Sequence, residues 1–208
     1  MKQDVHETIR NKRQYHTTPD PEAAKLGFRG WHTRGYLPHF DMPGVIQMLN
    51  YRLDDALPMS RQKEWAVLLN IKDELRRRAR IEEYVDRGYG ACELGHPNAA
   101  AVVENNWLQF DGRRYRLFAW VVMPNHVHLL VEVWQTPQSE LLRNWKGFTT
   151  RRINHLFQRR GKLWQDDYWD RYIRDAEHFL KVRNYIENNP VKAGLVRSPE
   201  QWPFSSAR

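Results

Sequence analysis

The chain has 208 residues, of which 41% are hydrophobic and 28% are charged. This length predicts one domain over residues 1–208 with a proper core, and no apolar run approaches the ~20 residues that a membrane-spanning helix needs. Lysine and arginine outnumber aspartate and glutamate by 33 to 25, which gives a net charge of +8 and favours a polyanionic partner such as nucleic acid.

The amino-terminal half of the chain alternates polar segments with two regular elements. We predict a loosely ordered segment over 1–27, a strand over 45–53 and a long helix over 60–87, to which we assign no function. Residues 29–40 mix glycine, arginine and aromatic residues. That mixture suits either a loop that grips a phosphate or base, or a purely structural glycine-rich loop.

The carboxy-terminal half alternates strands and helices more regularly. The elements we expect are a helix over 97–110, a hairpin of strands 115–123 and 126–134, a helix over 136–160, a short strand over 168–174, and a last helix from the capping residue Asp175 to Pro190. This order predicts an α+β fold, with a mainly antiparallel sheet flanked by helices.

The chain has a single cysteine, Cys92, which excludes an intramolecular disulfide framework and is typical of a reducing compartment. Residues 1–20 are polar and charged, so we expect no signal peptide. Both observations predict a cytoplasmic protein.

Basic residues gather in the third predicted helix. Residues 143–165 contain seven lysines and arginines and no acidic residue. A solvated helix face usually mixes both signs, so this unmixed run favours contact with phosphates.

The strand over 126–134 carries two histidines that share one of its faces. Side chains two apart in a strand point the same way, so His126 and His128 lie together, roughly 6.6 Å apart along the strand, while Val127 and Leu129 face a core. Two imidazoles at this spacing can bind one metal ion. A pair of solvated or hydrogen-bonded histidines is the alternative.

Tyr185 and Asn189 are four residues apart in the last predicted helix and therefore share a face. A tyrosine hydroxyl can act as a covalent nucleophile when a metal and nearby cations stabilise the developing charge, and cations should also favour the phenolate. The carboxamide oxygen of Asn189 could bind the same metal. By itself this pair is no motif, because tyrosines on amphipathic helices usually pack in cores.

The Tyr185–Asn189 pair and the two histidines lie in blocks of sequence that closely resemble the REP-associated tyrosine transposases. This family is related to the single-tyrosine insertion-sequence transposases in the HUH nuclease superfamily. The blocks are Ala119–Leu130, Leu163–Gln165, Tyr185–Val196 and Trp202–Ser206, and the resemblance runs from about residue 34 to residue 206. It implies a ferredoxin-like fold of an antiparallel sheet with flanking helices.

The resemblance also implies roles for individual residues. His126, His128 and Asn189 would bind a divalent metal, Mg²⁺ or Mn²⁺, and Tyr185 would be the nucleophile. The substrate would be single-stranded DNA with hairpins called repetitive extragenic palindromes (REP), cleaved and rejoined through a 5′-phosphotyrosine. A structural Zn²⁺ site would need four protein ligands, which the sequence does not offer. The REP-associated branch looks monomeric, so we expect a monomer, with a dimer as the alternative.

Further residues are predicted to surround this site. His178, upstream on the nucleophile's helix, is a possible accessory residue. The predicted DNA contacts are Arg34, Tyr36, Arg143, Lys146, Arg151, Arg152, Arg159, Arg160 and Lys181.

Three other functions remain open at this point. One is a DNA-hairpin binding protein without useful chemistry, against which the intact set of candidate site residues argues. Another is a metal-dependent protein that binds or processes RNA, which the 2′-hydroxyl would distinguish. The last is a metal-only hydrolase that uses water, whose cleavage would survive Tyr185→Phe.

Overall fold

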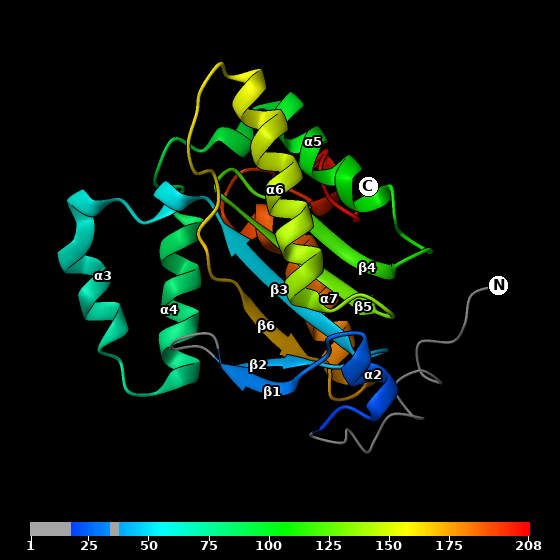
Figure 1. The fold of residues 1–208 in the computed structure, drawn as a ribbon. Helices are drawn as coiled ribbons and strands as arrows, with labels where there is room; N and C mark the ends of the chain where they lie inside the picture. Colours follow the sequence, from blue (N-terminus) through cyan, green and yellow to red (C-terminus); the bar gives the residue numbers. More distant parts are fainter. Residues whose placement is uncertain (1–17, 34–37) are drawn as a thin grey trace.

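The computed structural model describes residues 18–33 and 38–208. Its centre is a four-stranded antiparallel sheet in the order β4-β5-β3-β6 (Figure 1). The strands are β3 (Ile46–Arg52), β4 (Tyr115–Val122), β5 (His126–Val133) and β6 (Trp169–Tyr172). With the helices between them they give a β-α-β-β-α-β succession, so the predicted α+β, ferredoxin-like architecture is confirmed.

Helices cover both faces of this sheet. On one face, α5 (Pro97–Leu108) and α6 (Gln138–Leu156) bury side chains against Val127 and Leu129 of β5. On the other face, α7 (Ala176–Lys192) packs Phe179, Val182 and Ile186 against Leu130 and its neighbours. Figure 1 shows α6 and α7 on opposite sides of the strands. Successive side chains of β5 point to opposite faces of the sheet, and they therefore pack into two separate hydrophobic cores.

The hairpin and the later helices form close to where the sequence predicts them. The turn at Pro124–Asn125 joins β4 to β5, and the amide of Met123 donates to the carbonyl of His126 across it at 2.9 Å. The helix α6 ends at Leu156, four residues earlier than expected, and the left-handed Gln158 (φ 50°) follows it. The helix α7 continues two residues past Pro190, which lies in its last turn, where it removes only one donor.

Two predictions for the amino-terminal region are wrong where the structure describes it. Residues 18–27 are not loosely ordered throughout, because Asp20 caps the short helix α2 (Pro21–Lys25) and Ala23 is buried. Residues 30–33 and 38–40 do not lie in a loop, because β1 (Gly30–Thr33) pairs with β2 (Pro38–Asp41). Trp31 and Phe40 are paired across the two strands with their ring centroids 5.0 Å apart, and this aromatic pair stabilises the hairpin.

The long helix predicted over 60–87 is also wrong, because the segment forms two helices. These are α3 (Gln62–Leu69) and α4 (Glu74–Asp86). Asp73 starts the second helix, since its carboxylate accepts the amide of Arg76 at 2.7 Å, and Asn70 ends the first. Aspartate competes for helix-terminal amides in this way, which breaks a helix that hydrophobic spacing alone would continue.

The remaining elements are short. Residues 18–33 and 38–208 also include the 3-10 turns η1 (Asp54–Ala56), η2 (Met59–Arg61), η3 (Glu93–Gly95) and η4 (Pro199–Gln201). The carboxy-terminal segment covers the edge of β4, because Ser205 pairs with Val121 and the indole of Trp202 donates to the carbonyl of Val122 at 2.9 Å. Covering the edge protects it from pairing with another chain. Among the helices of the described part, none has the length and apolar character needed to cross a bilayer.

Candidate functional site

The two histidines of β5 lie together on the face of the sheet that α7 covers. Both side chains are buried, and their Nε2 atoms are 3.1 Å apart. The register of the sheet places Asn50 of β3 beside His128 and Arg52 beside His126. The two imidazoles therefore converge on one point, as the alternation in the sequence predicts.

Hydrogen bonds fix the orientation of both rings. Nδ1 of His126 is 2.8 Å from Oδ1 of Asn125, whose amide nitrogen donates to the carbonyls of Val85 and Tyr89. Nδ1 of His128 is 3.1 Å from the carboxamide nitrogen of Asn50. His126 thus donates from Nδ1 and keeps the lone pair of Nε2. For His128 also to donate from Nδ1 and keep the lone pair of Nε2, Asn50 must turn its carboxamide oxygen toward the ring.

Burial keeps both histidines neutral. It lowers the pKa of His126 well below the usual value, with the neighbouring His128 acting in the same direction. Burial also lowers the pKa of His128 to about 3. Neutral imidazoles are the form that binds metal ions, so this pair fits a divalent cation without having to lose a charge.

Two further buried oxygens adjoin the histidines. Asn189 is fully buried and its carboxamide approaches His126 and Tyr185 closely enough to affect the pKa of both, yet neither of its polar atoms makes a hydrogen bond of good geometry within the described residues. In Asp86 of α4, Oδ2 binds Lys192 at 2.9 Å, whereas Oδ1 is 3.5 Å from Nε2 of His126 and has no hydrogen-bond partner in that part of the chain. Buried oxygens without partners are costly, and a cation would satisfy them.

Histidine, cysteine and carboxylate side chains alone do not complete a metal site. Within residues 18–33 and 38–208, no group of three or more of them is arranged to hold an ion. Asn189 could add an amide oxygen to a site at the histidines, because its carboxamide is buried beside His126. Two imidazoles with amide or carboxylate oxygens are a donor set that suits Mn²⁺ or Mg²⁺.

Tyr185 projects from α7 beside the same histidines. Its ring meets that of His128 edge to face, with centroids 5.5 Å apart, and its hydroxyl donates to Oε2 of Glu82 in α4 at 3.0 Å. Burial raises the pKa of Tyr185, and Glu82 and Asp86 raise it further. The ammonium of Lys192 lies 5.5 Å from the ring centroid, and the expectation that a metal ion and nearby cations favour the phenolate stays a prediction.

The sequence reasoning missed the contribution of α4. Glu82 and Asp86 are four residues apart and share the helix face that meets α7 and β5. Their spacing was visible, but mixed charges surround them in the sequence, and many exposed helices carry such pairs. Asn50 and Asn125, which orient the histidine rings, had no distinguishing pattern either.

The basic residues of α6 lie across the sheet from this site. Arg143, Arg151 and Arg152 are exposed, and they belong to the helix that packs on the face opposite α7. Arg160 is exposed beyond the end of the helix, and Arg159 pairs with Glu93. As DNA contacts these residues stay predictions, and the structure does not bring them to the histidines.

The other predicted site residues are placed as follows. Lys146 donates to three carbonyls, of Gln165, Asp166 and Asp167, at 2.8–3.1 Å, so it ties a loop to α6. Lys181 is exposed and pairs with Glu177. His178 accepts the amide of Arg174 at the start of α7, two turns before Tyr185. Arg34 and Tyr36 lie outside the described residues.

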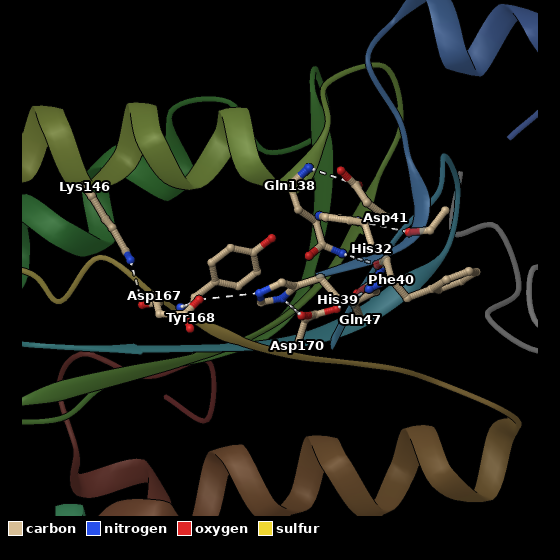
Figure 2. Close-up of polar contacts among 11 residues, drawn as sticks. His32, His39, Phe40, Asp41, Gln47, Gln138, Lys146, Asp167, Tyr168 and Asp170 are labelled. Carbon is tan, nitrogen blue, oxygen red and sulfur yellow. Dashed lines mark hydrogen bonds and ion pairs between the residues drawn. The ribbon is translucent and has the colours of Figure 1, made fainter. Parts of the chain in front are cut away.

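A second buried polar cluster fastens the β1–β2 hairpin to the main sheet (Figure 2). His39 of β2 contacts Asp170 of β6 through Nδ1 and lies 3.5 Å from Asp167 through Nε2. Asp41 accepts the amide of Gln138, at the start of α6, at 3.1 Å. Burial alone would lower the pKa of His39, but Asp167 and Asp170 override it and raise the pKa to about 9. Burial raises the pKa of Asp41 to about 7.

This cluster predicts that the protein is less stable in alkaline solution. Charged His39 stabilises the fold fully below pH 6.5, and that contribution, about 3 kcal/mol for a pKa of about 9, is lost as the pH rises through 9. Ionisation of Asp41 also lowers the stability of the fold as the pH rises to about 7. Urea unfolding from pH 5 to 10 should show the decline, and His39→Gln should flatten its part above pH 6.5.

His32→Gln is the matched control. The pKa of His32 is lowered, mainly by burial, so its loss should leave the alkaline decline in place. A decline of equal size in His39→Gln and the wild type would contradict the assignment to His39.

Comparison with known proteins finds transposases among the relatives of this chain. Residues 109–189, which include both histidines, Tyr185 and Asn189, match the family described as "Transposase IS200 like". The REP-associated tyrosine transposase of Escherichia coli (strain K12) is 30% identical over 96 residues, which are 45% of this chain and 55% of that protein. These matches show that part of the chain is similar to the REP-associated tyrosine transposases, the family that its motifs resemble.

Other relatives match over similar portions. A protein of Haemophilus influenzae Rd is 29% identical over 103 residues, which are 44% of this chain and 58% of that protein. The chain spans little more than half the length of these two relatives. A solved structure, a REP-associated tyrosine transposase bound to a REP hairpin, is 18% identical with a TM-score of 0.47, and the match covers 84% of this chain and 82% of that one.

Proposed function

We propose that this protein is a metal-dependent transesterase that cleaves and rejoins single-stranded DNA at REP-type hairpins through a 5′-phosphotyrosine. The observation that carries the proposal is the meeting of Tyr185, from α7, with the neutral histidine pair of β5. A REP-associated tyrosine transposase that is 30% identical over part of this chain, and the net charge of +8, support DNA as the substrate.

In this proposal His126, His128 and Asn189 hold Mg²⁺ or Mn²⁺, with Asp86 beside them. The ion would polarise a nonbridging phosphate oxygen and neutralise charge in the transition state. Asn125 and Asn50 orient the two imidazoles, and Lys192 holds one oxygen of Asp86 so that the other faces His126.

Glu82 is positioned to take the proton of the nucleophile. The hydroxyl of Tyr185 already donates to this carboxylate, so attack of the oxygen on phosphorus can proceed as the proton passes to Glu82. The bond from phosphorus to the 3′-oxygen breaks, and that oxygen leaves as a 3′-hydroxyl by taking a proton from solvent water. In the reverse direction the 3′-hydroxyl attacks the phosphotyrosine and the strand is rejoined.

Glu82→Gln should slow formation of the DNA–protein link by roughly 10²- to 10⁴-fold, the usual contribution of a general base. The measurement is the rate of adduct formation with a labelled REP hairpin and Mn²⁺ on a denaturing gel. Glu83→Gln is the matched control, because Glu83 is the exposed neighbour that pairs with Arg80. A wild-type rate in Glu82→Gln would remove Glu82 from the mechanism.

The protein is proposed to act in the cytoplasm as a monomer. Ultracentrifugation with and without hairpin DNA tests the oligomeric state. Binding of matched DNA and RNA hairpins in competition tests the choice of nucleic acid, since only RNA offers the 2′-hydroxyl.

A further inference from the structure

A cavity of about 610 Å³ lies between the α3–α4 pair and the edge of the main sheet. Trp65, Leu69 and Ile81 line it from the two helices, and Tyr168 and Trp169 line it from the start of β6 and the residue before it. Its walls are mostly apolar and aromatic, and its volume is in the range of pockets that bind small organic groups. The segment 60–87, to which the sequence assigned no function, forms one side of it.

The cavity adjoins the candidate active site through two shared residues. Asn50 lines the cavity and lies 3.1 Å from Nδ1 of His128. Glu82 also lines it and accepts the hydroxyl of Tyr185 at 3.0 Å. A group seated in the cavity would therefore lie next to whatever Tyr185 attacks.

The chemistry of the walls matches a nucleobase better than a bare phosphate. The guanidinium of Arg52 lies 5.2 Å from the ring centroid of Trp65, and Gln165 holds this arginine through a 2.6 Å hydrogen bond. Arg77 adds a second cation, while Glu82 and Asp167 add carboxylates, so the charges of the four side chains balance. Aromatic faces for stacking, with donors and acceptors at the rim, are the features that bind unpaired bases.

We propose that this cavity holds an unpaired nucleotide of the DNA strand adjacent to the scissile phosphate, stacked on Trp65. The proposal rests on the proposed function and extends it. The helix α4 would then contribute both to binding of the base, as a wall of the pocket, and to the reaction, through the carboxylate that accepts the hydrogen bond of the nucleophile. Holding the neighbouring base positions the phosphate for attack.

The test is an abasic scan. A hairpin with unpaired flanks is selected from a pool with random flanks by binding to the wild type, and each flanking nucleotide is then replaced in turn by an abasic site. Affinities are measured by fluorescence anisotropy with Mn²⁺, in the Tyr185→Phe background so that no bond breaks. One position should weaken binding by roughly 5- to 150-fold, the effect of losing one stacked base.

In the Trp65→Ala variant, an abasic site at that DNA position should weaken binding little further. In the Trp65→Phe variant, the same abasic site should still weaken binding almost as much as in the protein that keeps Trp65. Leu69→Trp is a second variant that fills the cavity without removing Trp65, and Leu69 is 45% exposed, so the fold should tolerate it. Val67→Ala is the matched control, because Val67 lies on the same helix but does not line the cavity.

Equal abasic effects with and without Trp65 would overturn the base pocket. Adduct formation by the wild type on the same oligonucleotide is measured separately, so the transesterase would stand in that case. A wild type that neither binds nor links to any hairpin of the pool would overturn both.

Discussion

Tyr185→Phe should abolish the covalent link between this protein and REP hairpin DNA. The substitution removes the hydroxyl that α7 places beside the histidine pair, and phenylalanine keeps the edge-to-face packing on His128. We expect adduct formation to fall by roughly 10³-fold or more, because losing a covalent nucleophile removes the reaction path itself. The measurement is a denaturing gel of labelled hairpin DNA with Mn²⁺ or Mg²⁺.

The hairpin should still bind, which a native gel or anisotropy would show. Tyr172→Phe is the matched control, since it removes a phenol of β6 outside the candidate site. Cleavage that survives Tyr185→Phe would point to a hydrolase that uses water. Binding without cleavage by both proteins would favour a protein that only binds hairpins.

The second large effect is expected at the histidine pair. His128→Gln and His126→Gln each remove an imidazole whose low pKa keeps it neutral. Mn²⁺ affinity should fall by at least the roughly 10- to 100-fold that loss of a group hydrogen-bonded to a metal ligand typically costs. Calorimetric titration of the DNA-free protein with Mn²⁺ measures this without reference to activity.

Adduct formation should fall in the same variants and recover in part at higher Mn²⁺ concentration. His155→Gln is the matched control, because His155 is exposed on α6. Thermal unfolding shows whether the buried substitutions retain the fold. Equal Mn²⁺ affinity in the wild type and both histidine variants would contradict the metal site.

Much of the fold follows from local patterns. Alternation along β5 separates His126 and His128 from Val127 and Leu129, and the structure places the two sets on opposite faces of the sheet, toward α7 and α6. The prediction of one long helix was wrong because a polar side chain can compete for backbone amides, which the spacing of apolar residues does not show. Asp73 caps a new helix where apolar periodicity alone predicts a continuous one.

For the candidate site as well, local motifs predicted one part and not another. A motif within one strand and one within a helix placed His126, His128, Tyr185 and Asn189 on the correct faces, because residues two apart in a strand, or four apart in a helix, share a side whatever the rest of the chain does. The basic run of α6 was equally visible, but its position across the sheet from α7 was not.

The sequence by itself determined the α+β class, the two histidines on one strand face and the resemblance to the REP-associated tyrosine transposases. Only the tertiary structure decided which groups surround them. Glu82 reaches Tyr185 across 103 residues of chain, and Asn50 reaches His128 across 78. Backbone geometry repeats every two or 3.6 residues and can be read locally, whereas contacts over such separations depend on how whole elements pack.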